Sequence, residues 1–99
     1  MSVIPVDSAP LPVPVPGIMY QALDDGAVLL APSSEVYFGL NHVGAAVWEH
    51  LPPVRATFGE LCAAVGAAYP DAPADAVRRD AARLLDELAA AGLVTAPTP

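Results

Sequence analysis

The two histidines are the residues best suited to metal chemistry, and their spacing argues against it. His42 and His50 lie eight positions apart in a segment whose apolar residues recur at helical spacing. They should therefore sit about two turns apart on roughly the same helix face. That separation is too long for one shared metal ion, and no third nitrogen or sulfur ligand lies close by in the sequence. We interpret both as surface or capping residues, and we expect no metal and no cofactor.

Catalysis by carboxylates or by a thiol is equally poorly supported. Asp24 and Asp25 fall in a predicted turn, and Asp86 and Glu87 fall on a solvated helix face, without a partner for general acid–base chemistry. Cys62 is the single cysteine, so it forms neither an internal disulfide nor a Cys-rich metal site. A chain of 99 residues makes one domain, too small to enclose a deep active-site cleft. We therefore do not expect this protein to be an enzyme.

The charge pattern argues against nucleic acid as a partner. There are 11 acidic residues and 4 basic ones, and the net charge is −7. Arg78, Arg79 and Arg83 could form a basic stripe, but acidic residues interleave them. Asp75 with Arg79, and Arg83 with Glu87, have the i,i+4 spacing of helical ion pairs. An acidic surface of this kind repels a phosphate backbone.

The first 16 residues alternate proline with Val, Leu and Ala, which favours an extended conformation. We interpret residues 1–16 as a flexible arm, residues 17–95 as the folded domain and residues 96–99 as a disordered tail. The uncharged stretch Ser8–Leu23 is short for a membrane span and is interrupted by prolines. No basic segment precedes an apolar one, as a secretory signal would require. We therefore expect a cytoplasmic protein without a membrane partner.

Three strands are predicted before any helix. Residues 18–23 and 27–31 are joined by Asp24-Asp25-Gly26, and Pro32-Ser33-Ser34 leads into a third strand at 35–40. Side chains alternate between the two faces of a strand. The sequence therefore places Val36, Phe38 and Leu40 on the core side, and Glu35, Tyr37 and Gly39 on the outer side.

Three helices should follow. Asn41 can cap a helix over 42–50, which Pro52 and Pro53 end. Thr57 and Glu60 form a capping box at the start of a helix that runs to Tyr69. The third helix, over 74–91, carries an apolar stripe and has Gly92 as its C-cap. Its stripe consists of Val77, Ala81, Leu84, Leu85 and Leu88. The fold class is α+β and winged-helix-like, with a three-stranded antiparallel sheet followed by three helices.

Five segments in this order and spacing carry a family resemblance over residues 18–94: GAVLL, EVYFGLN, VGAAVW, TFGELCAAVGAAY and LLDELAAAGLV. They resemble the PqqD-like family, also called RiPP recognition elements, and most closely its free-standing members in lasso-peptide biosynthesis. The resemblance implies binding of the leader region of a ribosomally made precursor peptide. It also implies presentation to a separate processing enzyme, either a cysteine peptidase of transglutaminase-like fold or, as for the name-giving member, a radical-SAM enzyme.

The resemblance further implies where the leader lies, and elementary strand chemistry supports that position. The leader would add as a strand to the edge of the third strand, beside the third helix, because unpaired N–H and C=O groups at an exposed edge accept an extended peptide. Tyr37 would cover an apolar leader side chain, and Glu35 and Asp80 would pair with leader lysines or arginines. The implied peptide-binding residues are Glu35, Val36, Tyr37, Phe38, Gly39, Leu40, Val77, Asp80, Ala81, Leu84 and Leu88.

One competing class is a winged-helix transcription regulator, whose third helix would enter the major groove of DNA. The net charge of −7 disfavours it. A small enzyme is disfavoured because no nucleophile–base pair can be assembled from the sequence.

Overall fold

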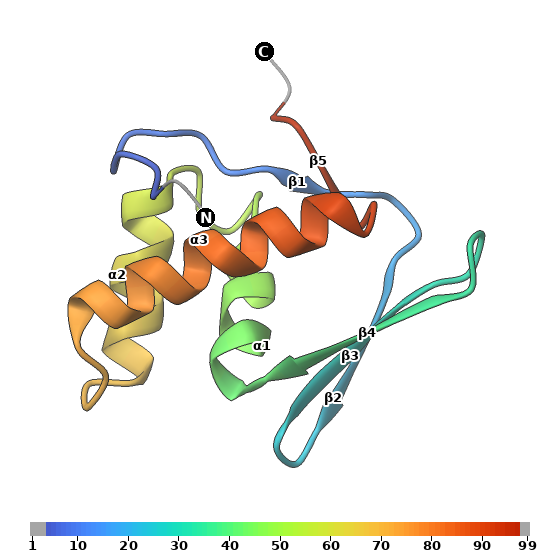
Figure 1. Cartoon of the computed structure of the whole chain (residues 1–99), viewed down its shortest axis with the longest axis horizontal. Coiled ribbons are helices and arrows are strands. Elements are labelled where there is room, and N and C mark those ends of the chain that lie inside the picture. Colours follow the sequence, from blue (N-terminus) through green and yellow to red (C-terminus); the bar gives the residue numbers. More distant parts are fainter. Residues whose placement is uncertain (1–3, 98–99) are drawn as a thin grey trace.

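The computed structural model describes residues 4–97 and places one three-stranded sheet beside three helices (Figure 1). The sheet contains β2 (Met19–Leu23), β3 (Gly26–Ala31) and β4 (Val36–Asn41). The helices are α1 (His42–Glu49), α2 (Phe58–Ala68) and α3 (Ala74–Ala90). Two short strands, β1 (Val13–Pro14) and β5 (Val94–Thr95), pair with each other. The predicted α+β fold, a three-stranded antiparallel sheet followed by three helices, is confirmed.

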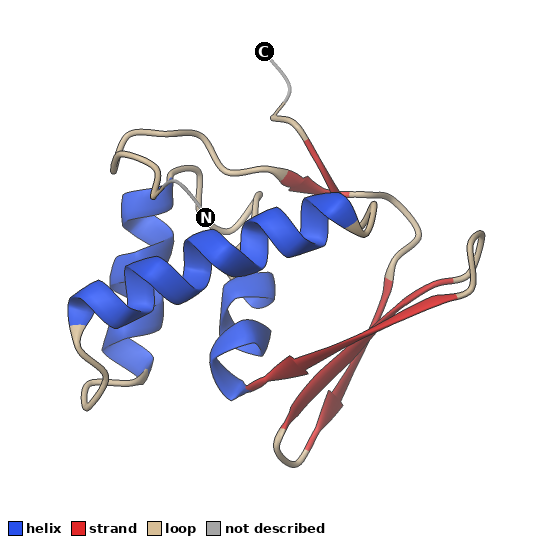
Figure 2. Ribbon diagram, in the orientation of Figure 1, coloured by secondary structure: helices blue, strands red, loops and turns tan. Residues whose placement is uncertain are grey.

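The sheet is an antiparallel meander with strand order β2-β3-β4. In the central strand β3, Ala27, Leu29 and Ala31 are buried on the side that faces the helices. All three helices lie on that side of the sheet (Figure 2), and α1 packs against β3 and β4. The alternation predicted for β4 is confirmed, because Leu40 is buried whereas Tyr37 is exposed.

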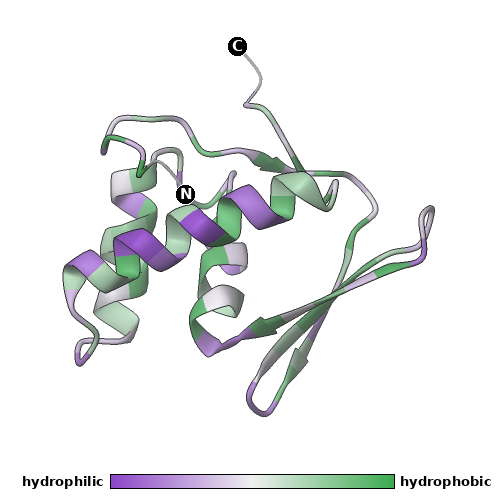
Figure 3. Ribbon diagram, viewed as in Figure 1, coloured by the Kyte–Doolittle hydropathy of each residue, from purple (hydrophilic) through white to green (hydrophobic). Residues whose placement is uncertain are grey.

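The core lies where α3 crosses α1 and α2 and where α1 meets the sheet (Figure 1). In Figure 3, hydrophilic residues recur along the ribbon of α3, whereas the strands are mostly hydrophobic apart from the hairpin tips. A helix of this kind buries one apolar stripe and leaves its opposite face to water. The fully buried large side chains are Leu11, Leu29, Val47, Phe58, Leu61, Val65, Leu88 and Leu93.

The predicted helix caps are present. The Asn41 side-chain oxygen accepts the Gly44 N–H at 2.8 Å, which caps α1. The Thr57 hydroxyl accepts the Glu60 N–H at 3.3 Å at the start of α2. The Glu60 carboxylate bonds one residue further back than a standard capping box, at the Ala56 N–H, 3.2 Å away.

The end of α3 is a complete Schellman motif. Gly92 has φ +76°, a left-handed conformation that glycine adopts without a steric penalty. The Gly92 N–H donates to the Ala89 carbonyl at 3.1 Å, and the Leu93 N–H donates to the Leu88 carbonyl at 2.9 Å. This turn directs the chain from α3 into β5, where it meets β1.

The N-terminal segment differs from the flexible arm expected for residues 1–16. Within its described part, residues 4–16, Leu11 is only 2% exposed, and its N–H donates to the Ala56 carbonyl at 3.0 Å. The carbonyls of Asp7 and Ala9 accept the N–H groups of the first turn of α2, from Gly59 and Phe58, each at 2.9 Å. A helix N-terminus leaves such N–H groups without an intrahelical partner, so the arm supplies an acceptor that α2 needs.

A side-chain contact and a strand pair hold the same segment against α3. Arg78 of α3 forms an ion pair with Asp7 and also lies over the Phe58 ring, 5.4 Å from its centroid. β1 pairs with β5 just after the end of α3. Proline-rich composition does not reveal whether such a segment is docked against the rest of the domain. The expected tail at 96–99 reaches residues 98 and 99, which lie outside the described residues.

No helix within residues 4–97 combines the length and the apolar character that a membrane crossing needs.

Candidate peptide-binding groove

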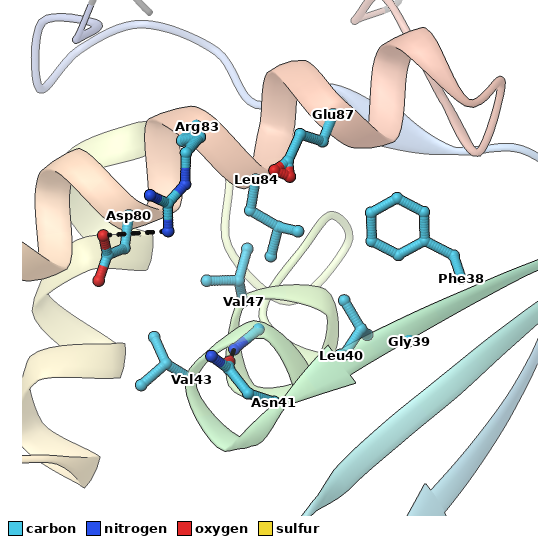
Figure 4. A pocket seen from close by; sticks show the side chains of 11 residues that line it. Phe38, Gly39, Leu40, Asn41, Val43, Val47, Asp80, Arg83, Leu84 and Glu87 are labelled. Carbon is cyan, nitrogen blue, oxygen red and sulfur yellow. Dashed lines mark hydrogen bonds and ion pairs between the residues drawn. The ribbon is translucent and has the colours of Figure 1, made fainter.

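The sheet has two outer edges, at β2 and at β4, and residues of β4 line a pocket together with residues of α3. Within residues 4–97, no strand pairs with the outer edge of β4. A groove of about 240 Å³ lies between this strand and α3 (Figure 4). This volume is smaller than the roughly 300–1,000 Å³ of a typical small-molecule site. Its lining residues are Phe38, Gly39, Leu40, Asn41, Val43, Gly44, Val47, Asp80, Arg83, Leu84 and Glu87.

The position of one carbonyl fixes which backbone groups of β4 face the open edge. A side-chain carbon added at Gly26 of β3 would lie 1.9 Å from the Leu40 carbonyl oxygen, so this oxygen points toward β3. In an antiparallel pair, alternate residues direct both of their backbone groups to the partner strand. Leu40 and Phe38 therefore bond to β3, whereas Tyr37 and Gly39 direct their N–H and C=O groups to the open edge.

Five of the residues that the sequence suggested for peptide binding come together around the groove. Phe38 and Leu40 present their core-side faces to it, and Leu84 faces them from α3 (Figure 4). Asp80 lies at the same helix face, and Gly39 lies at the strand edge. Gly39 has no side chain, and a side-chain carbon added there would meet no other atom within 4 Å.

Three other suggested residues of β4 and the turn before it lie outside the groove. Tyr37 is 72% exposed on the outer face of the sheet. Glu35 is in the turn before β4, with φ +56°, and lines a separate shallow hollow together with Tyr37. Val36 is half-buried on the core side and does not line the groove.

The three remaining suggested residues, Val77, Ala81 and Leu88, belong to the core. They are 3%, 0% and 0% exposed, so a bound peptide could not touch them. Successive residues of a helix turn by about 100°, which places the groove-lining row of α3 about a quarter turn away from this buried row. The predicted apolar stripe of α3 therefore contains residues from two neighbouring rows of the helix, of which only one lines the groove.

Arg83, Glu87 and Val43 line the groove but were not among the predicted peptide-binding residues. Arg83 and Glu87 share a helix face with Asp80 and Leu84, because their positions are three or four apart. That spacing was available in the sequence and could have identified them. Val43 of α1 had no such signal, because its place in the groove depends on how α1 packs under β4.

The groove carries two carboxylates and one guanidinium. The Arg83 Nη2 atom lies 3.4 Å from Oδ1 of Asp80, so Arg83 pairs backward along α3 rather than with Glu87 as its spacing suggested. Within the described residues, Glu87 has no ion pair. The groove therefore has an excess of negative charge beside an apolar floor.

Two shifted pKa values lie away from the groove. The Tyr20 hydroxyl donates a hydrogen bond to Glu49, and this bond, reinforced by partial burial, raises the pKa of Tyr20 to about 12. Burial raises the pKa of the Cys62 thiol, as expected of a core residue. Within residues 4–97, no cluster of three His, Cys, Asp or Glu side chains is arranged to hold a metal ion.

The fold and the groove together define an α+β domain that presents an open strand edge beside a helix. Residues 26–94, well over half of the chain, match the family model described as coenzyme PQQ synthesis protein D (PqqD). The chain belongs to the PqqD family.

A solved structure is similar over nearly the whole chain. It is described as TbiB1 in complex with the TbiA(beta) leader peptide, and its sequence is 28% identical to this one. The similarity covers 88% of this chain and 99% of the TbiB1 chain, with a TM-score of 0.73. A comparison with curated proteins gives no match.

Proposed function

We propose that this protein binds the leader region of a ribosomally made precursor peptide as an added strand on β4. The observation that carries the proposal is the open edge of β4 beside the groove under α3. Backbone pairing at such an edge supplies affinity, and pockets for alternate side chains supply selectivity. The similarity to TbiB1, whose structure contains a leader peptide, supports the same function.

The edge of β4 suits this role better than the edge of β2. Tyr37 and Gly39 direct hydrogen-bonding groups outward, so a peptide could pair with both without disturbing β3. Peptide side chains on the core side would then enter the groove at Phe38 and Leu84. Those on the other side would lie next to the exposed ring of Tyr37.

Charge favours a leader with basic residues. Glu87 has no ion pair in the described structure, and Asp80 shares its charge with Arg83, so Glu87 is the better partner for a leader lysine or arginine. Glu35 lies beside Tyr37 and could pair with a residue at the outer end of the peptide. The net charge of −7 would also accelerate the encounter with a basic peptide.

The protein would act without chemistry of its own, presenting the leader to a separate enzyme in the cytoplasm. For a lasso-peptide precursor, that enzyme is a cysteine peptidase of transglutaminase-like fold. The alternative is a radical-SAM enzyme, as for the name-giving member of the family. Adding this protein to each purified enzyme with the precursor distinguishes them, because only the true partner should modify its substrate faster.

Fluorescence anisotropy tests leader binding directly. A labelled synthetic leader, taken from a precursor encoded next to this protein, should bind saturably and equally well with or without a chelator. A scrambled peptide of the same composition controls for nonspecific charge attraction. Binding that needs metal, or equal affinity for the scrambled peptide or for duplex DNA at physiological salt, would contradict the proposal.

A further inference from the structure

A second hollow lies on the outer face of the sheet, and it is lined by Leu30, Pro32, Glu35 and Tyr37. Leu30 and Tyr37 are directly paired across β3 and β4, so their side chains share this face. Pro32 and Glu35 belong to the turn between these strands, which projects away from the helices (Figure 1). Among the four residues, only Glu35 is charged. This outer hollow therefore combines apolar surface with one carboxylate at its rim.

Glu35 adopts a backbone conformation that glycine would adopt more easily. Its φ of +56° lies in the left-handed region, and within residues 4–97 no other non-glycine residue has a positive φ. Glu35 also makes no ion pair in the described part of the chain. The geometry of the turn alone therefore does not account for a carboxylate at this position. Side chains held in such conformations cluster at binding sites.

The outer hollow adjoins the strand edge at which the leader is proposed to pair, so the following inference rests on the proposed function. Neighbouring residues of adjacent strands carry their side chains on the same face. The leader residue beside Tyr37 therefore has its side chain on the outer face. Strands are about 4.8 Å apart, and Leu30 is one strand further than Tyr37, about 10 Å from the leader backbone. Only a long side chain that crosses the Tyr37 ring reaches the hollow.

We propose that the outer hollow holds the side chain of an arginine or lysine of the leader, at the residue that pairs beside Tyr37. Such a side chain has an aliphatic stem that lies along apolar surface and a charged head that stays in water. The stem lies toward Leu30, and the head pairs with Glu35. Arginine fits better than lysine, because its guanidinium also stacks on an aromatic ring, and the Tyr37 ring is 72% exposed.

Strand alternation relates this basic residue to the leader residues that enter the groove. Leader side chains next to Phe38 and Leu84 face the helices, on the opposite face from the outer hollow. Two residues on opposite faces of one strand are an odd number of positions apart. The leader should therefore carry an arginine or lysine an odd number of positions from the apolar residue that fills the groove.

Anisotropy with a labelled synthetic leader, from the precursor encoded next to this protein, tests the inference on the full chain. Glu35→Gln keeps the shape of the side chain and should weaken binding by about twofold to fivefold, as expected for one exposed ion pair. Asp24→Asn, at the opposite end of the sheet, changes the net charge equally and should bind like the wild type. Equal losses in both variants would mean general charge attraction and would overturn the inference.

A second pair of variants tests the aromatic contact. Tyr37→Leu should weaken binding by a similar factor, because the ring is lost, whereas Tyr37→Phe keeps the ring and should bind like the wild type. Glu35→Gly removes the carboxylate and the left-handed strain together. It should melt within a few degrees of the wild type and still lose the same binding as Glu35→Gln, which excludes misfolding as the cause.

A series of leader peptides identifies the partner of Glu35. Each arginine is replaced by citrulline and each lysine by norleucine, one at a time, which removes the charge and keeps the stem. At one position the replacement should weaken binding, and Glu35→Gln should then cause no further loss. That position should be an odd number of positions from the leader residue that couples in the same way to Leu84→Ala.

The outcomes separate this inference from the proposed function. A leader without arginine or lysine, the absence of any coupled position, or an even separation from the groove residue would overturn the inference alone, provided that the wild type binds the leader. A wild type that binds no leader would overturn the proposed function as well.

Discussion

Substituting Gly39 by proline separates the two hydrogen-bonding sides of β4. The Gly39 N–H faces the open edge, so β3 does not use it, and a side-chain carbon at this position would meet no other atom within 4 Å. Proline is tolerated on an edge strand when its missing N–H faces outward. Gly39→Pro should therefore fold, while an incoming strand loses a donor and meets the proline ring.

The size of the effect follows from what the leader would lose. A lost neutral hydrogen bond costs about 0.5–1.5 kcal/mol, and leaving the leader carbonyl without a partner in a partly dry groove costs about 1–3 kcal/mol. Since 1.4 kcal/mol is a factor of ten, we expect leader affinity to fall by about tenfold to a hundredfold. Anisotropy with the labelled leader gives the affinity, and a thermal melt of the same sample reports folding.

Two controls make the result decisive. Gly39→Ala keeps the N–H and should bind within about threefold of the wild type, because the added methyl group enters open space. Phe38→Pro removes an N–H that bonds to β3, so it should lower thermal stability strongly. A folded Gly39→Pro variant that binds leader as well as Gly39→Ala would refute strand addition at β4.

Three further predictions concern other parts of the structure. Leu84→Ala should weaken leader binding with little loss of stability, whereas Leu88→Ala, at 0% exposure, should cost about 2–5 kcal/mol of unfolding free energy in urea titrations. Leu11→Ala should cost a similar amount, and a variant as stable as the wild type would mean that the arm is not docked as described. The hydrogen bond from Tyr20 to Glu49 should stabilise the fold by a constant amount below about pH 10, and this stabilisation should disappear as the pH rises toward 12. The reason is that Tyr20 loses its proton at a lower pH in the unfolded chain than in the folded one. Thermal melts of Tyr20→Phe should lack this decrease in stability between pH 10 and 12.

Local signals in the sequence were sufficient for most of the fold. Asn41, Thr57 and Gly92 mark helix ends because each satisfies backbone groups within a few residues, which makes the signal independent of tertiary packing. The alternation in β4 is equally local. The docking of the arm was not predictable, because the partners of Leu11, at Ala56 and in the core, are distant in sequence.

The site was partly predictable for the same reason. Alternation correctly predicted that Phe38 and Leu40 face the helix side of β4, and both residues line the groove. On α3, the sequence shows one broad apolar stripe, and only the position of α1 and β4 divides it into a buried row and a groove-lining row. Leu84 and Leu88 are one turn apart and look alike in sequence, yet one lines the groove and the other is buried.

The docked arm bears on the groove because it holds α3 near both of its ends. Near the first turn, Arg78 is tied to Asp7, and just past the last turn, β5 pairs with β1. The groove width is the distance between α3 and β4, and no strand or loop of the described chain spans the two. A helix fixed at both ends keeps that width without a ligand, which lowers the ordering cost of binding. The proline-rich segment thus supports α3 from the side opposite the groove, where it lies against Ala82, Leu85 and Ala89.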